Sequence, residues 1–78
     1  MTESKINEDI KQRFFQEIER LITIKEMPSV NQFLKAHEID SRNFYKTKMK
    51  ENLKVPALWI YYICMDYSVS SDKIIIGR

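Results

Sequence analysis

Apolar residues recur at every third or fourth position in the N-terminal third of the chain, which is the period of an amphipathic helix. Between residues 8 and 25 the repeating apolar positions are Ile10, Phe14, Ile18, Leu21 and Ile22. Acidic residues open this stretch, where they suit the positive end of a helix dipole. The pattern predicts a first helix over residues 8–25 that buries the apolar stripe.

The next two helices are marked by capping residues rather than by a long periodic pattern. Pro28 cannot continue a helix interior, so the first helix is expected to end before it. Ser29, followed three residues later by Gln32, matches a capping box and predicts a second helix over residues 30–37. Asp40 is the next favourable N-cap, so a third helix is expected to begin with the residue after it.

The last third of the chain predicts two further helices. Pro56 suits the first position of a fourth helix that runs to about Tyr67. Ser70 is a suitable cap for a short fifth helix that contains the sequence DKIII and stops at Gly77. The three isoleucines are β-branched, however, and a strand or an extended tail is the alternative for this segment.

Length and composition limit the fold to one small domain. The chain has 78 residues with a single glycine and two prolines, which favours helices over hairpins because hairpins need frequent turn residues. We therefore expect one domain over residues 1–78, an all-α compact bundle of about five short helices. Helices two and three would form a helix-turn-helix.

A cluster of basic residues falls within the expected third helix, in the sequence IDSRNFYKTKMK at residues 39–50. Successive helical residues advance by about 100° around the axis, which separates the side chains into two faces. The polar face is expected to hold Arg42, Asn43, Lys46, Thr47 and Lys50. The opposite face is expected to hold Phe44, Tyr45, Lys48 and Met49.

Charge is distributed unevenly along the chain. The formal net charge is only +2, yet residues 42–54 carry five basic residues and one acidic residue. A short basic stripe of this kind suits the phosphates of a nucleic acid. The alternative is that these lysines and the arginine simply solvate an exposed helix face.

The side chains of the third helix match the groups that read double-stranded DNA. Arg42 can donate two hydrogen bonds to guanine, and Asn43 can pair with the edge of adenine. Thr47 could contact a phosphate or a thymine methyl group. The side chains expected to contact phosphates are those of Lys46, Lys48, Lys50 and Lys54.

The sequence SVNQFLKAHEIDSRNF at residues 29–44 resembles the helix-turn-helix of phage-repressor-like regulators of the lambda repressor and Cro type. The sequence YSVSSDKIIIGR resembles the closing pattern of such proteins, and RNFY before a Trp-containing helix is most similar to small regulators encoded by Bacteroidetes mobile elements. The resemblance covers about residues 10–78. It implies a bacterial transcription regulator that binds double-stranded DNA.

Several positions take their meaning from this resemblance. Val30 stands where the family often has a glutamine that binds the DNA backbone. Glu38 replaces the usual turn glycine, which implies either a left-handed residue or a different turn. Lys73 replaces the terminal Trp that anchors the last helix, and Phe44 corresponds to the core anchor of the third helix. The exposed positions of the recognition helix would be Arg42, Asn43, Lys46 and Thr47.

Residue types that carry catalysis or bind metals do not form a recognisable set. Cys64 is the only cysteine and lies among apolar residues, so we expect a structural thiol. His37 is the only histidine and is expected at the end of the second helix. Glu17 and Glu19 are expected on a surface helix with no nucleophile or base nearby. We therefore expect no enzymatic activity, no metal site and no cofactor.

The N-terminal residues lack the apolar run of a signal peptide, and residues 55–65 are too few to span a membrane. A cytoplasmic protein without membrane contact is therefore expected. The fourth helix is apolar around most of its circumference. Tyr61, Met65 and residues 74–76 are candidates for a homodimer contact. The alternative places Trp59, Tyr62 and Ile63 in the core, with the tyrosine hydroxyls in water.

The pattern as a whole predicts sequence-specific binding of double-stranded DNA, with the third helix in the major groove. The alternative is a protein–protein interaction module that keeps the helix-turn-helix scaffold without reading DNA. The low net charge favours this alternative, as do Val30 and Glu38.

Overall fold

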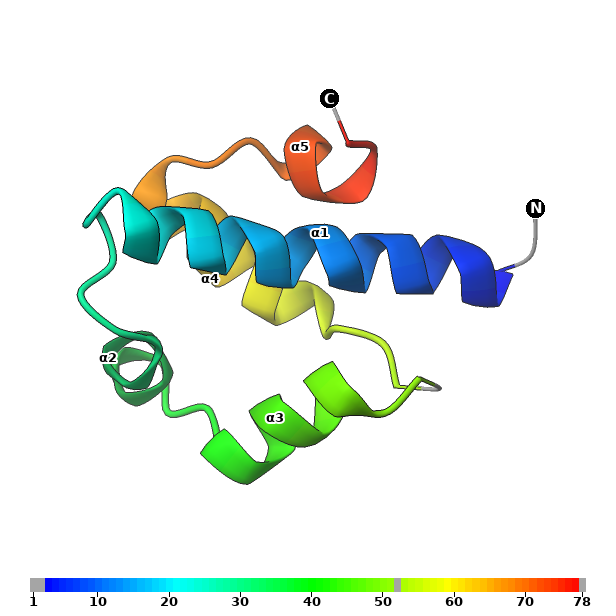
Figure 1. Cartoon of the computed structure of the whole chain (residues 1–78), viewed down its shortest axis with the longest axis horizontal. Helices are drawn as coiled ribbons and strands as arrows, with labels where there is room; N and C mark the ends of the chain where they lie inside the picture. Colours follow the sequence, from blue (N-terminus) through cyan, green and yellow to red (C-terminus); the bar gives the residue numbers. More distant parts are fainter. Residues whose placement is uncertain (1–2, 52, 78) are drawn as a thin grey trace.

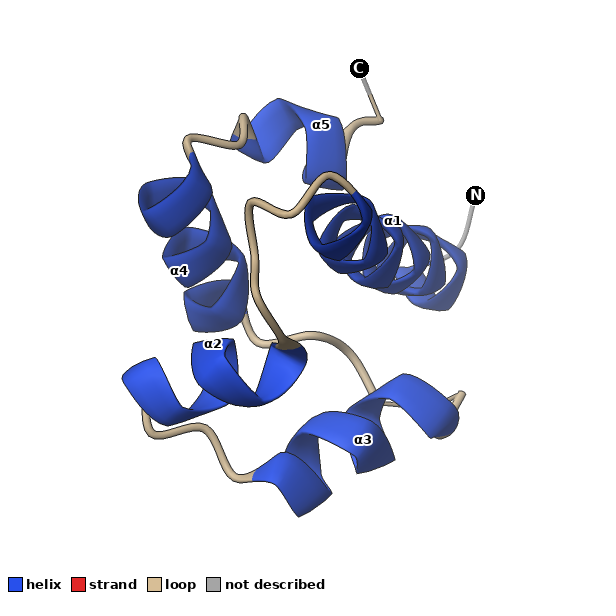
Figure 2. Ribbon diagram, turned by 60° about the vertical axis from the view of Figure 1, so that its left-hand side comes forward, coloured by secondary structure: helices blue, strands red, loops and turns tan. Residues whose placement is uncertain are grey.

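Five helices follow one another in a computed structural model that describes residues 3–51 and 53–77 (Figure 1). They are α1 (Glu3–Thr23), α2 (Val30–Ala36), α3 (Ser41–Met49), α4 (Ala57–Tyr67) and α5 (Ser71–Ile75). No strand occurs among these described residues (Figure 2). The all-α prediction is confirmed, and the isoleucine-rich segment is helical rather than extended.

The long helix α1 extends along the length of the molecule (Figure 1). In both views α5 lies on one side of α1 and α3 on the other, with α2 and α4 completing the bundle (Figures 1 and 2). Helix α5 packs against both α1 and α4. The radius of gyration is 12.0 Å, close to the value of about 11.5 Å expected for a compact chain of this length.

Local sequence signals explain where these helices begin. The three predicted N-caps are confirmed, because Ser29, Asp40 and Ser70 each accept a hydrogen bond from an amide of the following turn, at 3.2, 3.2 and 3.3 Å. The least accurate boundary is that of α1, which begins five residues before the predicted start and ends two residues before the predicted end.

Aromatic side chains join α1, α3 and α4 in one core. Phe44 of α3 is 1% exposed, and its ring centroid lies 5.2 Å from Phe15 of α1 and 5.4 Å from Trp59 of α4. The ring of Phe14 of α1 also lies near Trp59, with centroids 6.5 Å apart. The expected anchor of the third helix is therefore buried between two other helices, which fixes the position of α3.

The end of α5 is held by a cation from α1. The guanidinium of Arg13 donates hydrogen bonds to the carbonyls of Ile74 and Ile75, each at 2.7 Å. The last carbonyls of a helix have no partner within the helix, and a cation there also suits the negative end of the helix dipole. This contact fastens the C-terminal segment to α1.

An ion-pair cluster strengthens the same attachment. Glu17 was expected on the surface, but it is only 4% exposed, because α5 covers this part of α1. Its carboxylate accepts a hydrogen bond from Arg20 at 2.8 Å and pairs with Lys73 of α5 at 3.1 Å. Lys73 stands where the resemblance expects an anchoring Trp, and it anchors the last helix through charge instead.

No helix in the described part of the chain is both long and apolar enough to cross a membrane.

Candidate nucleic-acid interface

The turn between α2 and α3 is built around Glu38, which has a positive φ of 54°. The amide of Glu38 donates to the carbonyl of Lys35 at 3.3 Å, and the amide of Ile39 donates to that of Leu34 at 2.9 Å. These two bonds form a Schellman motif, in which a left-handed residue ends the helix. Of the two alternatives for this position, the left-handed residue is the one observed.

The inner face of α3 differs from the predicted one. Thr47, expected on the exposed polar face, is 4% exposed and lies on the buried side together with Phe44. The buried face is therefore centred between positions 44 and 47. The predicted division into two faces is rotated around the helix axis relative to the observed one. Because Thr47 is enclosed, its side chain cannot reach a DNA molecule placed against the outer face.

Lys48 also turns towards α1 rather than away from it. Its ammonium lies 5.7 Å from the centroid of the Phe15 ring, within range of a cation–π interaction. The side chain is exposed overall. Its direction makes Lys48 a less suitable phosphate contact than the other lysines of this region.

The outer face of α3 carries a mixture of charged, polar and apolar side chains. Arg42, Asn43, Lys46 and Lys50 are exposed, as predicted from the sequence. Two side chains that were expected on the opposite face of the helix join them. Tyr45 is 45% exposed and Met49 is 78% exposed. The outer face of α3 is defined below as Arg42, Asn43, Tyr45, Lys46, Met49 and Lys50.

Four basic side chains of this region form no ion pair in the described part of the chain that would compete with a ligand. Within residues 3–51 and 53–77, the ion pairs involve none of Arg42, Lys46, Lys50 and Lys54. Lys54 is exposed in the loop after α3. A cation without a protein partner can exchange its counterions for phosphates, which is the main source of affinity for nucleic acids.

The C-terminal end of α3 is fixed by Lys11 of α1. This residue was not among those predicted to matter for the site. Its ammonium donates to the carbonyls of Thr47, Lys50 and Leu53 at 3.2, 2.6 and 3.1 Å. It also pairs with Glu8 at 3.5 Å. Lys11 is 4% exposed, so this is a nearly enclosed ammonium with several partners. It holds the last turn of α3 and the loop that carries Lys54 against α1.

A signal for Lys11 is present in the sequence. It stands three residues before Phe14, four before Phe15 and seven before Ile18, so it occupies the buried stripe of α1. A lysine on a buried stripe needs polar partners. The carbonyls at the end of a neighbouring helix supply them.

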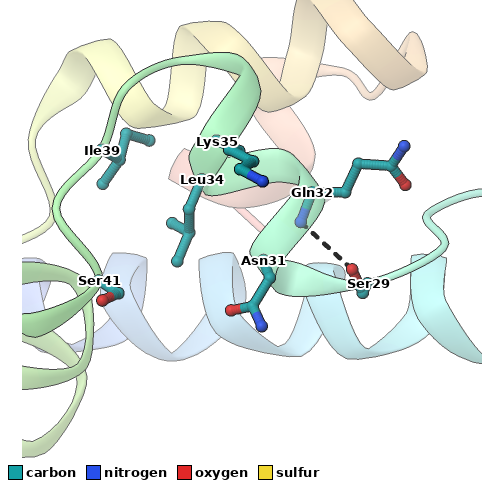
Figure 3. A pocket seen from close by; sticks show the side chains of 7 residues that line it. All are labelled: Ser29, Asn31, Gln32, Leu34, Lys35, Ile39 and Ser41. Carbon is teal, nitrogen blue, oxygen red and sulfur yellow. Dashed lines mark hydrogen bonds between the residues drawn. The ribbon is translucent and has the colours of Figure 1, made fainter.

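A hollow of about 620 Å³ opens beside the beginning of α3. Side chains of α2 form one side, and Ile39 and Ser41 form the other (Figure 3). The residues that line it are Ser29, Asn31, Gln32, Leu34, Lys35, Ile39 and Ser41. Hydroxyl, amide and ammonium groups therefore border the exposed first turn of α3, where Arg42 begins the outer face.

His37 connects the turn to α4. Its Nε2 atom lies 2.6 Å from Oδ2 of Asp66, and its ring stacks on Tyr62 with centroids 3.9 Å apart. The expected helix-end histidine is thus a structural link between α2 and α4. No group of three His, Cys, Asp or Glu side chains that could hold a metal occurs in the described residues.

Comparisons with known proteins returned no match. No family model matches the chain, and neither a curated protein nor a solved structure matches it. The functional assignment accordingly depends on the chemistry of the chain's own side chains.

Proposed function

We propose that this protein binds double-stranded DNA sequence-specifically, as a cytoplasmic transcription regulator of the repressor type without enzymatic activity. Helix α3 would lie in the major groove. The observation that carries the proposal is the outer face of α3, which combines Arg42 and Asn43 in the first turn with the unpaired charges of Lys46 and Lys50. Arginine and asparagine are residue types that read base edges, and lysine is a residue type that contacts phosphates.

The attachment of α3 supports the same proposal. A reading helix must be held rigidly so that its side chains reach the bases in a defined register. Phe44 fixes α3 through the core, and Lys11 fixes its C-terminal end. The N-terminal end is capped by Asp40. Helix α3 is therefore capped at its start, packed through its middle and held against α1 at its end, while its outer face remains open.

A salt series on the purified protein tests the proposal. Affinity for a mixed-sequence duplex should fall steeply as salt is raised, because each phosphate contact contributes a slope of about 0.9 in log affinity against log salt. The double variant Lys46→Ala/Lys50→Ala should reduce that slope by about 1.8. Lys48→Ala removes the same type of charge from the same helix but from the side facing Phe15, so it should reduce the slope by clearly less than about 0.9. Absence of binding at low salt would reject the DNA proposal.

A protein–protein interaction module on the same scaffold is the second candidate. The observation that favours it is the number of large apolar side chains left exposed, since contiguous apolar surface marks partner sites. On α4 these are Leu58, Tyr61 and Met65, which share one side of the helix at a spacing of three and four residues. This candidate would be supported if the wild-type protein fails to bind DNA but binds another protein that the variant Tyr61→Ala no longer binds.

We also propose a homodimer through the exposed side of α4 and the C-terminal segment, because helix-turn-helix proteins commonly bind two-fold symmetric sites. Ile75 and Ile76 are 45% and 56% exposed and add to the apolar surface of that segment. Trp59 and Ile63 point into the core, so α4 has one buried and one exposed side. Sedimentation equilibrium of the wild-type protein beside Tyr61→Glu would test the dimer, which the charge should dissociate.

A further inference from the structure

The apolar side chains on the outer face of α3 have no role in phosphate binding. Met49 is 78% exposed, more than any other large apolar side chain in the described residues, and Tyr45 is 45% exposed on the same helix. Exposed apolar surface of this size costs free energy that burial against a partner would recover. Their surroundings are basic, so the partner must be both negatively charged and able to offer apolar contacts.

Arg42, Tyr45 and Met49 form a row along the outer face of α3. Tyr45 follows Arg42 by three residues and Met49 follows it by seven, so all three lie on one side of the helix. With a rise of about 1.5 Å per residue, Met49 stands about 10 Å along the axis from Arg42. At about 3.4 Å per base-pair step, a helix lying in the groove would span at most about three base pairs over that length.

One DNA base offers an apolar group at this place. Thymine carries a 5-methyl group in the major groove, and none of the other three bases presents a methyl group there. Methionine is flexible and polarisable, so it can adapt to a methyl group whose position varies between sites. Tyr45 is held more rigidly, because its ring packs edge-on against Phe44 with centroids 5.3 Å apart.

We infer that Met49, with Tyr45 beside it, forms an apolar reading surface for thymine methyl groups within about three base pairs of the base that Arg42 contacts. The inference rests on the proposed function and adds a preference to it. Arg42 and Asn43 would select bases through hydrogen bonds, and Met49 would select thymine through its methyl group.

The test replaces thymine by uracil, which removes only the methyl group. A duplex enriched by the wild-type protein from a random-sequence pool is prepared again with deoxyuridine at one thymidine position at a time. The wild-type protein should lose about fourfold in affinity at one or two positions, the factor expected for burial of one methyl-sized group. Uracil outside the protected region should have no effect.

The variant Met49→Ala should bind the thymidine and deoxyuridine duplexes equally at those positions. Met65→Ala removes a similar exposed methionine from α4 and should keep the wild-type sensitivity. Because both side chains are exposed, the variants should melt at the wild-type temperature.

The outcomes separate this inference from the proposed function. A wild-type protein that enriches a duplex but binds every uracil version equally overturns the thymine contact and leaves DNA binding in place. The same holds if Met49→Ala retains the fourfold sensitivity. If no duplex is enriched from the pool, DNA binding itself fails, and the thymine contact fails with it.

Discussion

The ammonium of Lys11 donates a hydrogen bond of 2.6 Å to the backbone carbonyl of Lys50, and so joins the first helix to the end of α3. The bond is one of three that the same ammonium makes in this region, the others going to Thr47 and Leu53. The last carbonyls of a helix have no partner inside the helix. A side chain of α1 therefore supplies the hydrogen-bond donor that these carbonyls lack within α3.

Replacing this ammonium should destabilise the protein. Lys11→Met keeps an unbranched stem but leaves the carbonyls at the end of α3 without their donor, which should cost about 1–3 kcal/mol. Urea unfolding followed by circular dichroism would measure the loss. Gln12→Met changes the exposed neighbouring residue and should alter stability by less than about 0.5 kcal/mol. Equal stabilities of the two variants would show that the Lys11 contacts contribute little.

Stability should depend on pH through Glu17. The hydrogen bond from Arg20 lowers the pKa of this carboxyl below 4.5, burial opposes that effect, and Lys73 adds to the lowering. A carboxyl whose pKa is lower in the folded state stabilises the fold above its unfolded pKa, and that contribution disappears as pH falls through the folded pKa. The wild-type protein should therefore lose stability on acidification below about pH 4.5.

Glu17→Gln removes this titration. The variant should be less stable at pH 7, and its melting temperature should change less than that of the wild type between pH 5 and the acid limit of folding. Glu19→Gln serves as the control, since Glu19 is exposed on the same helix. Thermal melts at several pH values compare the three proteins. Parallel curves for the wild type and Glu17→Gln would contradict the assignment.

Cys64 should react slowly with thiol reagents. Burial raises the pKa of its thiol, and the nearby carboxylate of Glu17 raises it further. Less thiolate is then present at a given pH, and thiolate is the reactive form. At pH 8 the reaction of the folded protein with an aromatic disulfide should be slower than that of free cysteine and should accelerate in urea. An equal rate in the folded state would identify an accessible thiol.

Capping residues and apolar spacing were sufficient to predict the helices. Ser29, Asp40 and Ser70 act within a few residues of their own positions, so a single sequence reveals them. The start of α1 was missed because the apolar spacing that identified this helix is sparse before residue 8. Helix boundaries are the least reliable part of such predictions.

The site was less predictable because it depends on contacts between distant segments. The rotation of α3 is set by Phe44 packing between α1 and α4, and this rotation buries Thr47 and exposes Met49. A helical wheel separates polar from apolar residues but cannot show which of them a neighbouring helix covers. The role of Lys11 likewise depends on residues 36 to 42 positions further along the chain.

The proposed roles of Arg42 and Lys50 predict different effects on sequence preference. Arg42→Ala should cost on the order of 1–3 kcal/mol on the preferred duplex and much less on a scrambled one, because a base contact exists only at the right sequence. Lys50→Ala should weaken both duplexes by a similar factor, since a phosphate is present in every sequence. Its backbone carbonyl remains available to Lys11, so the end of α3 should stay in place. Titrations of both variants on both duplexes would measure this, and the same loss on both sequences for both variants would show that Arg42 does not read a base.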